Sequence, residues 1–327
     1  MPIPWKRFAE IVEQNHSFIL TTHMRADCDA IGSELAMAHA LRSLGKHVCI
    51  LNGDGVPPHI AFIDSAGEVQ TLDPEAKPAD EGKTDVLMVL DTSAWSQLGP
   101  MADVVRASNA VKVVVDHHVG GDDLGAESFT DVNAEATGRL VLEATQALGV
   151  GLTPQVATAL FAAIATDTGW FRFSSVTAKT YEAASQLIAA GANPTAVFSA
   201  LYERHSFARL HLQGRILTSA QLDIDGRLIY SSVTREDLDQ TGAETTDTED
   251  VVNRLLSVRG IEVALLFLEL ESEKTKVSLR SRTTVDVRAV AERFGGGGHT
   301  AAAGVRFAGS LAKAKTAVLD AMREAME

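Results

Sequence analysis

The sequence predicts an α/β protein in which an N-terminal parallel-sheet domain is joined by a helical linker to a smaller α+β domain. Two observations predict this fold class. Short apolar runs alternate with helical patterns through the first half of the chain, as in β-α-β units. A hairpin signal at Asp225-Gly226 then begins a stretch of different texture. We therefore expect domains at 1–190 and 221–327, with a helical linker at 191–220.

The first elements set a β-α-β rhythm. The apolar residues 18–20 predict a buried strand, and helical spacing over 30–41 ends before Gly45, a residue typical of helix C-caps. A second strand is expected at 47–51. A surface loop is expected over 73–84, which is rich in Pro, Asp, Glu and Lys.

Two further strands, 85–90 and 111–115, are almost continuously apolar, as buried parallel strands are. Helical patterns follow at 134–148, 153–166, 177–190, 194–203 and 207–220. In the smaller domain the sequence predicts a hairpin at 222–230, an acidic solvated loop at 236–250, a helix at 251–258, strands near 261–270 and 275–281, and a C-terminal helix from Leu311.

Composition limits the partners. A formal charge of −14 over 327 residues argues against an extended clamp on duplex DNA, which would need many phosphate-neutralising side chains. Two cysteines are too few for a disulfide scaffold and indicate a reducing compartment. We find no signal peptide and no apolar run of membrane-spanning length, so the expected location is the cytoplasm, without a membrane partner.

Polar residues gather where the predicted strands end. His23, Asp27 and Asp29 lie on a strand-to-helix turn, and other strand or helix ends carry Asp91, Asp116, His117, His118 and Asp167. In open α/β sheets, ligands bind beyond the carboxyl ends of the strands. Four carboxylates converging without a cation would repel one another and raise each other's pKa.

Two divalent cations would offset the charges of four carboxylates, those of Asp27, Asp29, Asp91 and Asp167. Oxygen ligands with a minority of imidazole favour Mn²⁺, with Mg²⁺, Co²⁺ or Fe²⁺ as alternatives. Two such ions about 3.5–4 Å apart clamp the oxygens of an in-line phosphoryl displacement. The cluster therefore predicts hydrolysis of a phosphate ester.

These motifs give the chain a resemblance to the DHH family of phosphoesterases. Asp116-His117-His118 corresponds to the motif that names the family, and residues 23–33, 90–93 and 166–169 resemble its other metal-binding motifs. Residues 295–304 resemble the signature of the DHH-associated substrate domain. One departure is Cys28, where the family commonly has glycine; we interpret it as a small side chain that fits the turn.

The resemblance implies a role for each matched residue. His23 and Asp27 would bind one metal ion, the second ion would have Asp29, His117 and Asp167, and Asp91 would bridge the two. His118 would lie near the scissile phosphate, to orient it or to help protonate the leaving oxygen. Asp116 would support the histidines.

The smaller domain would then select the substrate. The run Gly295-Gly296-Gly297-Gly298 permits close approach of backbone amides to an anion, and His299 follows it. No Lys-Ser or Lys-Thr follows, so this is not a Walker motif. Of Arg280 and Arg282, the resemblance favours Arg280 for gripping a terminal phosphate, with Arg282 facing solvent. Arg172 is a further candidate for phosphate contact.

The implied activity is that of the nanoRNase type of this family, which degrades oligoribonucleotides of a few residues and in many cases also removes the 3'-phosphate of 3'-phosphoadenosine 5'-phosphate. A linear or cyclic dinucleotide phosphodiesterase is the closest alternative. A family II pyrophosphatase fits less well, because its second domain lacks the glycine run. A nonenzymatic nucleotide sensor is a further alternative, although a sensor would be expected to have lost ligands. Relatives in the family are often dimers, so a homodimer is an option here.

Overall fold

The computed structural model describes residues 3–73 and 84–327. It confirms the predicted fold class, with a parallel sheet in the N-terminal part and a mixed sheet with helices after it. The chain divides into two compact units, Met1–Arg204 and His205–Glu327. This division falls inside the predicted linker, with one helix of the linker in each unit. The predicted surface loop at 73–84 lies almost wholly outside the described residues.

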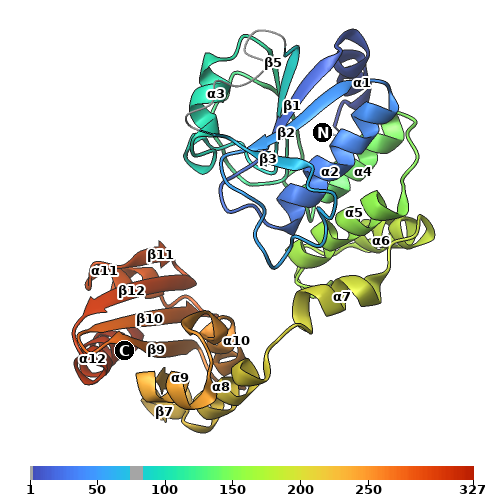
Figure 1. The fold of residues 1–327 in the computed structure, drawn as a ribbon. Coiled ribbons are helices and arrows are strands. Elements are labelled where there is room, and N and C mark those ends of the chain that lie inside the picture. Colours follow the sequence, from blue (N-terminus) through green and yellow to red (C-terminus); the bar gives the residue numbers. More distant parts are fainter. Residues whose placement is uncertain (1–2, 74–83) are drawn as a thin grey trace. The chain divides into compact units, whose positions relative to one another are not determined.

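The first unit contains a six-stranded sheet in the order β3-β2-β1-β4-β5-β6, and every pairing in it is parallel (Figure 1). Its strands are β1 (Ser17–Thr21), β2 (His47–Asn52), β3 (Val69–Thr71), β4 (Val86–Leu90), β5 (Val111–Asp116) and β6 (Glu127–Thr130). The chain leaves β1 on one side to form β2 and later continues on its other side with β4. The strand order therefore reverses between β1 and β4, which is the usual place for a ligand in such a sheet.

Helices cover both faces of this sheet. One face packs against α1 (Trp5–Gln14), α2 (Cys28–Ser43), α4 (Thr137–Ala147) and α5 (Pro154–Asp167), with α6 (Ala178–Ala189) and α7 (Pro194–Tyr202) added at the outside of this layer. The other face packs against α3 (Met101–Ala107). All five residues of β4 are buried because alternate side chains enter the two cores.

Helix α2 lies inside the first layer of helices, against α4 and α5. Residues 28–38 of it are all buried, so this part of the helix is enclosed rather than amphipathic. Gly32 makes the contact with α5 possible: a Cβ there would lie 2.6 Å from the carbonyl oxygen of Ala159. The N-terminus of α2 is thereby held at the strand ends.

The second unit contains a six-stranded mixed sheet in the order β11-β12-β10-β9-β8-β7. Only β8 and β9 pair in parallel. The strands are β7 (Gln221–Asp223), β8 (Leu228–Val233), β9 (Val263–Glu271), β10 (Lys274–Ser281), β11 (Gly297–His299) and β12 (Ala302–Ala308). One face packs against α11 (Val287–Glu292) and α12 (Leu311–Met326), and the other packs against α8 (Phe207–Thr218), α9 (Arg235–Thr241) and α10 (Val251–Leu256).

The expectation of an acidic loop at 236–250 was wrong for its first part, which is helical. Thr234 and Asp237 form a capping box, in which each side chain binds the other's backbone amide, and this box begins α9. Gly242, with a φ of 70°, then ends the helix in the left-handed conformation. Three of the acidic residues, Glu236, Asp237 and Asp239, belong to α9. The others follow it, in and around a short 3₁₀ helix at Thr245–Thr248.

Candidate active site

The candidate site lies at the carboxyl ends of β1, β4 and β5, next to the point where the strand order reverses. Helix α2 contributes its N-terminus and α5 its C-terminus. Among the described residues, three groups of side chains have ligand atoms close enough together to hold a metal ion: His23, Asp27 and Asp91; Asp29, His117 and Asp167; and Asp91, His117 and His118. The structure thus brings together all six predicted metal ligands.

The two aspartates on α2 are held by backbone amides. Asp27 is the N-cap, and its Oδ1 accepts hydrogen bonds from the amides of Asp29 and Ala30. Asp29 is buried, and its two oxygens accept from the amides of Thr137 and Gly138, each at 2.7 Å. These amides are the first two of α4, whose N-cap residue is an alanine and makes no side-chain cap. Asp29 therefore takes the position of an anion at a helix N-terminus.

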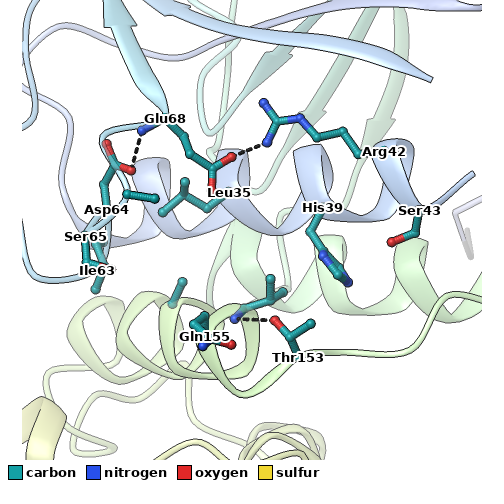
Figure 2. Close-up of a pocket in the computed structure, with 13 residues that line it drawn as sticks. Leu35, His39, Arg42, Ser43, Ile63, Asp64, Ser65, Glu68, Thr153 and Gln155 are labelled. Atoms are coloured by element: carbon teal, nitrogen blue, oxygen red, sulfur yellow. Dashed lines mark hydrogen bonds and ion pairs between the residues drawn. The ribbon is translucent and has the colours of Figure 1, made fainter. Parts of the chain in front are cut away.

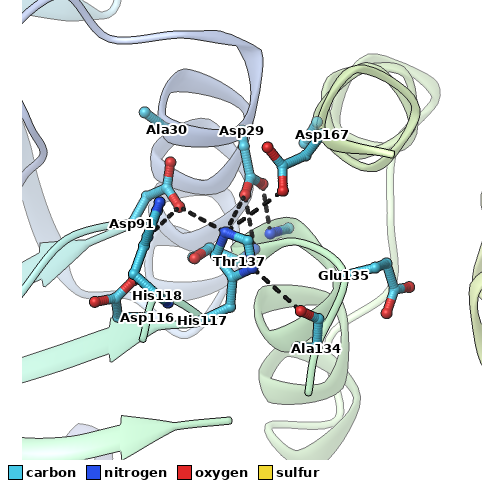
Figure 3. Close-up of polar contacts among 12 residues, drawn as sticks. Asp29, Ala30, Asp91, Asp116, His117, His118, Ala134, Glu135, Thr137 and Asp167 are labelled. Atoms are coloured by element: carbon cyan, nitrogen blue, oxygen red, sulfur yellow. Dashed lines mark hydrogen bonds and ion pairs between the residues drawn. The ribbon is translucent and has the colours of Figure 1, made fainter. Parts of the chain in front are cut away.

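Both candidate histidine ligands are oriented by a backbone carbonyl. The Nδ1 of His117 lies 3.1 Å from the carbonyl oxygen of Ala134, and the Nδ1 of His23 lies 3.0 Å from that of Met24. A carbonyl only accepts, so each Nδ1 donates a proton to it, and each Nε2 is the ring nitrogen that faces the carboxylates. Figure 3 shows the His117 ring pointing toward Asp29, Asp91 and Asp167, with Nε2 3.5–3.8 Å from their oxygens.

Asp91 occupies the centre of the cluster. It follows β4 with a φ of 63°, a strained left-handed conformation for a residue other than glycine. One of its oxygens, Oδ2, lies 3.4 Å from Nε2 of His23, and the other, Oδ1, lies 3.7 Å from Nε2 of His117. Oδ1 is buried and has no hydrogen-bond partner within the described residues. Asp91 can thus serve both groups of ligands at once.

The electrostatics of the cluster call for a cation. Burial, then the charges of Asp91, Asp167 and Asp27, raises the pKa of Asp29 well above its usual range. Burial and the charge of Asp27 do the same to the pKa of Asp91. A buried carboxylate oxygen without a partner is costly, and bound divalent cations would remove this cost. The residues present therefore fit a metal site, and Cys28, which is buried, belongs to none of the three groups.

His118 and Asp116 form a separate pair beside the cluster. The Nδ1 of His118 lies 2.8 Å from Oδ1 of Asp116, whose other oxygen accepts a 2.8 Å hydrogen bond from Ser93 Oγ. Burial alone would raise the pKa of Asp116, but the bonds from His118 and Ser93 hold it below its usual value. The hydrogen bond to Asp116 raises the pKa of His118 to about 9.

A cavity of about 310 Å³ opens over these groups. It is lined by His23, Asp27, Asp91, His118 and Asp167, and by the residues that follow β4 and β5. The loop after His118 packs closely on Ser93, because a Cβ at Gly121 would lie 2.2 Å from Ser93 Oγ. His118 is more than half exposed at the cavity wall, so a substrate can reach it.

A larger cavity, of about 480 Å³, lies elsewhere in the first unit, between α2 and α5 (Figure 2). Its polar wall is made by His39, Arg42, Asp64, Glu68 and Thr153. Arg42 pairs with Glu68, and the Asp64 carboxylate accepts from the Glu68 amide, so these charges are already satisfied. None of the three metal-ligand groups contributes to this cavity. We assign the chemistry to the smaller cavity.

The candidate substrate residues of the second unit lie on its sheet. Arg280 is half-buried on β10, and its Nη1 donates to the carbonyl of Leu279. Arg282 is exposed and donates to the carbonyl of Leu256, at the end of α10. The glycine run turns from α11 into β11, so His299 is exposed on the outer strand. Arg172, in the first unit, is exposed and donates to the carbonyl of Gly169.

Three of the four glycines are required by the backbone itself. Gly295 and Gly298 have φ values of 74° and 141°, and a Cβ at Gly296 would lie 2.3 Å from the Gly304 carbonyl oxygen. Gly297 has neither constraint, and a Cβ there would meet no atom within 4 Å. Its missing side chain leaves the outer strand open to a ligand.

Sequence reasoning gave no role to several residues that hold the site, namely Ser93, Ala134, Thr137 and Gly138. Three of them act through backbone groups, so their residue types do not signal the contact. The signal for Ser93 was present in its position two residues after Asp91 at a strand end.

The comparisons with known proteins identify the family. Residues 17–164 match the family model described as DHH family, N-terminal domain, and residues 225–327 match the DHHA1 domain. A relative from Thermus thermophilus, the bifunctional oligoribonuclease and PAP phosphatase NrnA, is 31% identical over 306 residues, which cover 93% of this chain and 89% of the relative. The chain therefore belongs to the DHH family of phosphoesterases, whose members are metal-dependent.

Three further proteins are similar to this chain. The Bacillus subtilis protein of the same name is 26% identical over 88% of both chains. The crystal structure of an exopolyphosphatase-related protein from Bacteroides fragilis covers 98% of this chain and 95% of its own, with 26% identity and a TM-score of 0.86. The cyclic-di-AMP phosphodiesterase GdpP of Geobacillus thermodenitrificans is 28% identical, but this chain spans only 44% of it.

Proposed function

We propose that this chain is a hydrolase of phosphoric ester bonds that degrades short oligoribonucleotides to mononucleotides and converts 3'-phosphoadenosine 5'-phosphate to AMP. The observation that carries the proposal is the pair of three-ligand groups, one around His23 and one around His117, with Asp91 within reach of both. The relatives named as bifunctional oligoribonuclease and PAP phosphatase align along most of their length, which supports this substrate class.

We assign His23 and Asp27 to one ion, Asp29, His117 and Asp167 to the other, and Asp91 to both. Four carboxylates and two imidazoles are a ligand set that suits Mn²⁺. Bound there, the two ions would lower the pKa of a water molecule and neutralise charge on the phosphate. Backbone carbonyls fix the ring orientations of His23 and His117 before any metal ion binds, so the two side chains would lose little conformational entropy on metal binding.

The chain's own residues handle the leaving group. In hydrolysis the water oxygen forms a bond to phosphorus, the bond to the ester oxygen breaks, and that oxygen needs a proton. The Nδ1–H of His118 is hydrogen-bonded to Asp116 and keeps its proton. With the pKa of His118 raised to about 9, the ring holds a second proton, on Nε2, which it can donate to the leaving oxygen. Ser93 holds Asp116 from its other side, so the imidazole has a defined orientation. We therefore count Asp91, Asp116 and His118 as the catalytic set.

On the second unit we assign the terminal phosphate to Arg280, His299 and the backbone of Gly296, Gly297 and Gly298. Arg172 of the first unit is an additional candidate for phosphate contact, because its remaining guanidinium donors are exposed. The described residues include no helix long and apolar enough to cross a bilayer. We further propose that the chain acts in the cytoplasm and assembles as a homodimer.

The test is hydrolysis by metal-stripped protein with Mn²⁺ restored. An RNA dinucleotide, an RNA pentanucleotide, linear and cyclic diadenylate, 3'-phosphoadenosine 5'-phosphate and pyrophosphate are offered in parallel. Mononucleotides from the short RNAs and AMP from the bisphosphate are the expected products. Cleavage of cyclic diadenylate or pyrophosphate alone would replace the proposal with one of those activities, and no Mn²⁺-dependent hydrolysis of any substrate would favour a nucleotide sensor.

A further inference from the structure

One half of a sheet face in the second unit lies outside the apolar core that the helices form on that face. Helices α8, α9 and α10 bury the side chains of Ile229, Val233, Ala264, Leu266 and Leu268, all from β8 and β9. Among the described residues, that core takes no side chain from β10, β11 or β12. The side chains that these three strands direct to this face are exposed or half-buried. We call this area the open half-face.

Strand register defines which residues share it. Arg280 pairs with Ala302, which pairs with His299, and this forms the first row. Ser278, Gly304 and Gly297 form the second row, and Lys276 and Arg306 form the third. Directly opposite residues of antiparallel strands point to the same face, and alternate residues of one strand do so as well. The three rows therefore belong to one surface.

The third row places two like charges side by side. Lys276 and Arg306 are directly opposite, both are exposed, and the described residues offer neither of them a hydrogen bond or an ion pair that the structure records. No position of the three rows carries an acidic side chain. Like charges opposite each other destabilise a sheet, so folding gives no reason for this pair. Binding of an anionic ligand would explain it.

We propose that Lys276 and Arg306 bind a second phosphate of the oligonucleotide, upstream or downstream of the one held by the row of Arg280 and His299. This inference rests on the proposed function and adds a determinant of substrate length to it. Four residues of strand separate the two rows, or about 13 Å. A chain with several phosphodiesters can place a different phosphate at each row.

The middle row supports a chain-like ligand. Ser278, Gly304 and Gly297 have short side chains or none, so no long or apolar side chain rises between the two basic rows. Proteins that bind single strands without sequence preference use a positively charged surface that follows the backbone. The open half-face has this form, with cations at both ends and small residues between them.

The experiment compares two double variants of the full chain. Lys276→Gln with Arg306→Gln removes the third row. Lys313→Gln with Arg323→Gln removes one lysine and one arginine from α12, which packs on the opposite face of the sheet, and serves as the matched control. Binding of a fluorescent RNA pentanucleotide is measured in EDTA, where no hydrolysis occurs, over a series of salt concentrations. With Mn²⁺ restored, kcat/KM is measured for the pentanucleotide and the dinucleotide.

The third-row variant should bind the pentanucleotide about tenfold more weakly, with the slope of log affinity against log salt reduced by roughly 0.7, because one phosphate is no longer neutralised. Its ratio of kcat/KM for pentanucleotide to dinucleotide should fall about tenfold. The inference would be overturned if the third-row variant had the affinity and salt slope of the control variant. It would also be overturned by an unchanged ratio of kcat/KM for the two RNAs, or if the unmodified chain did not bind the pentanucleotide. Binding with this pattern but without hydrolysis of any RNA would instead overturn the proposed function alone.

Discussion

The carboxylate of Asp29 caps helix α4 through the amides of Thr137 and Gly138, at 2.7 Å each. One candidate metal ligand is thus also a structural element that joins α2 to α4. The cap gives Asp29 a fixed orientation, and it favours the ionised form against the burial and the neighbouring carboxylates that raise the pKa of Asp29.

Gly138→Ala should damage this junction. A Cβ at this position would lie 2.8 Å from the Cβ of Ala163 and 3.1 Å from Oδ1 of Asp29. Overpacking of this kind costs about 1–3 kcal/mol of unfolding free energy, which urea titration of the metal-free protein measures. Gly151→Ala is the control, because a Cβ there meets no atom within 4 Å. Equal stabilities of the two variants would contradict the close packing.

Asp91→Asn should lower kcat/KM by about 10³-fold, because the bridging carboxylate contributes several kcal/mol through the metal pair. Mn²⁺ titration by calorimetry should show fewer or weaker sites than in the unmodified chain. The metal-free variant should be at least as stable as the unmodified chain, since it lacks a buried carboxylate whose pKa is raised. Activity within tenfold of the unmodified chain would exclude a bridging role.

His118→Gln should separate catalysis from metal binding. We expect turnover to slow by roughly two to four orders of magnitude, the usual contribution of a general acid, while the Mn²⁺ stoichiometry is retained. The measurement is steady-state kinetics beside metal analysis of the same preparation. Asp116→Asn should give a smaller loss in the same direction, because it removes the negative charge beside Nδ1 and leaves the imidazole in place. Loss of bound Mn²⁺ in His118→Gln would make His118 a ligand instead.

Glu34→Gln should change how stability depends on pH. Burial raises the pKa of Glu34 from 4.5 to about 8, so between these values the folded chain holds a proton that the unfolded chain has released. Stability from this group is therefore lost as pH rises from 4.5 to 8. The variant lacks this loss, so its advantage over the unmodified chain should grow by about 3 kcal/mol between about pH 5 and 8. Parallel urea-unfolding stabilities across this range would contradict the assignment.

Arg280→Gln should raise KM for 3'-phosphoadenosine 5'-phosphate about tenfold, because a charge-assisted contact to a phosphate is lost equally from ground and transition states. Arg282→Gln, two residues along the same strand, is the matched control, since Arg282 binds the Leu256 carbonyl at the end of α10. Initial rates over a range of substrate concentration separate KM from kcat. An equal effect of both variants would move the phosphate contact away from Arg280.

The candidate ligands at the strand ends could be predicted because each one directly follows an apolar strand in the sequence. The apolar run of β4 stops at Asp91, and the run of β5 stops before His117, so the period of the pattern locates both side chains. The capping role of Asp29 was not predictable in this way. It depends on amides more than 100 residues away, and their side chains carry no sign of the contact.

The second sheet was harder to predict at its edge. Strand β12 consists largely of alanine and glycine up to Gly304, residues that are depleted in strands, and it was not predicted. The missing strand concealed the pairing of Lys276 with Arg306, which only the register reveals. In the same unit, the acidic composition of 236–250 predicted a loop. The reciprocal hydrogen bonds of Thr234 and Asp237 instead begin a helix there.

The burial of α2 affects how fast its amide hydrogens exchange with solvent and how a bound metal ion leaves the site. Ala30 and Ile31 are buried without measurable exposure, and their helix is surrounded by α4, α5 and the sheet. No small local opening can release such a helix, so the amide hydrogens in its first turn should exchange with deuterium only when the whole first unit unfolds. An ion held at its N-terminus would then leave through the cavity mouth, and its residence time would be independent of breathing motions of the scaffold.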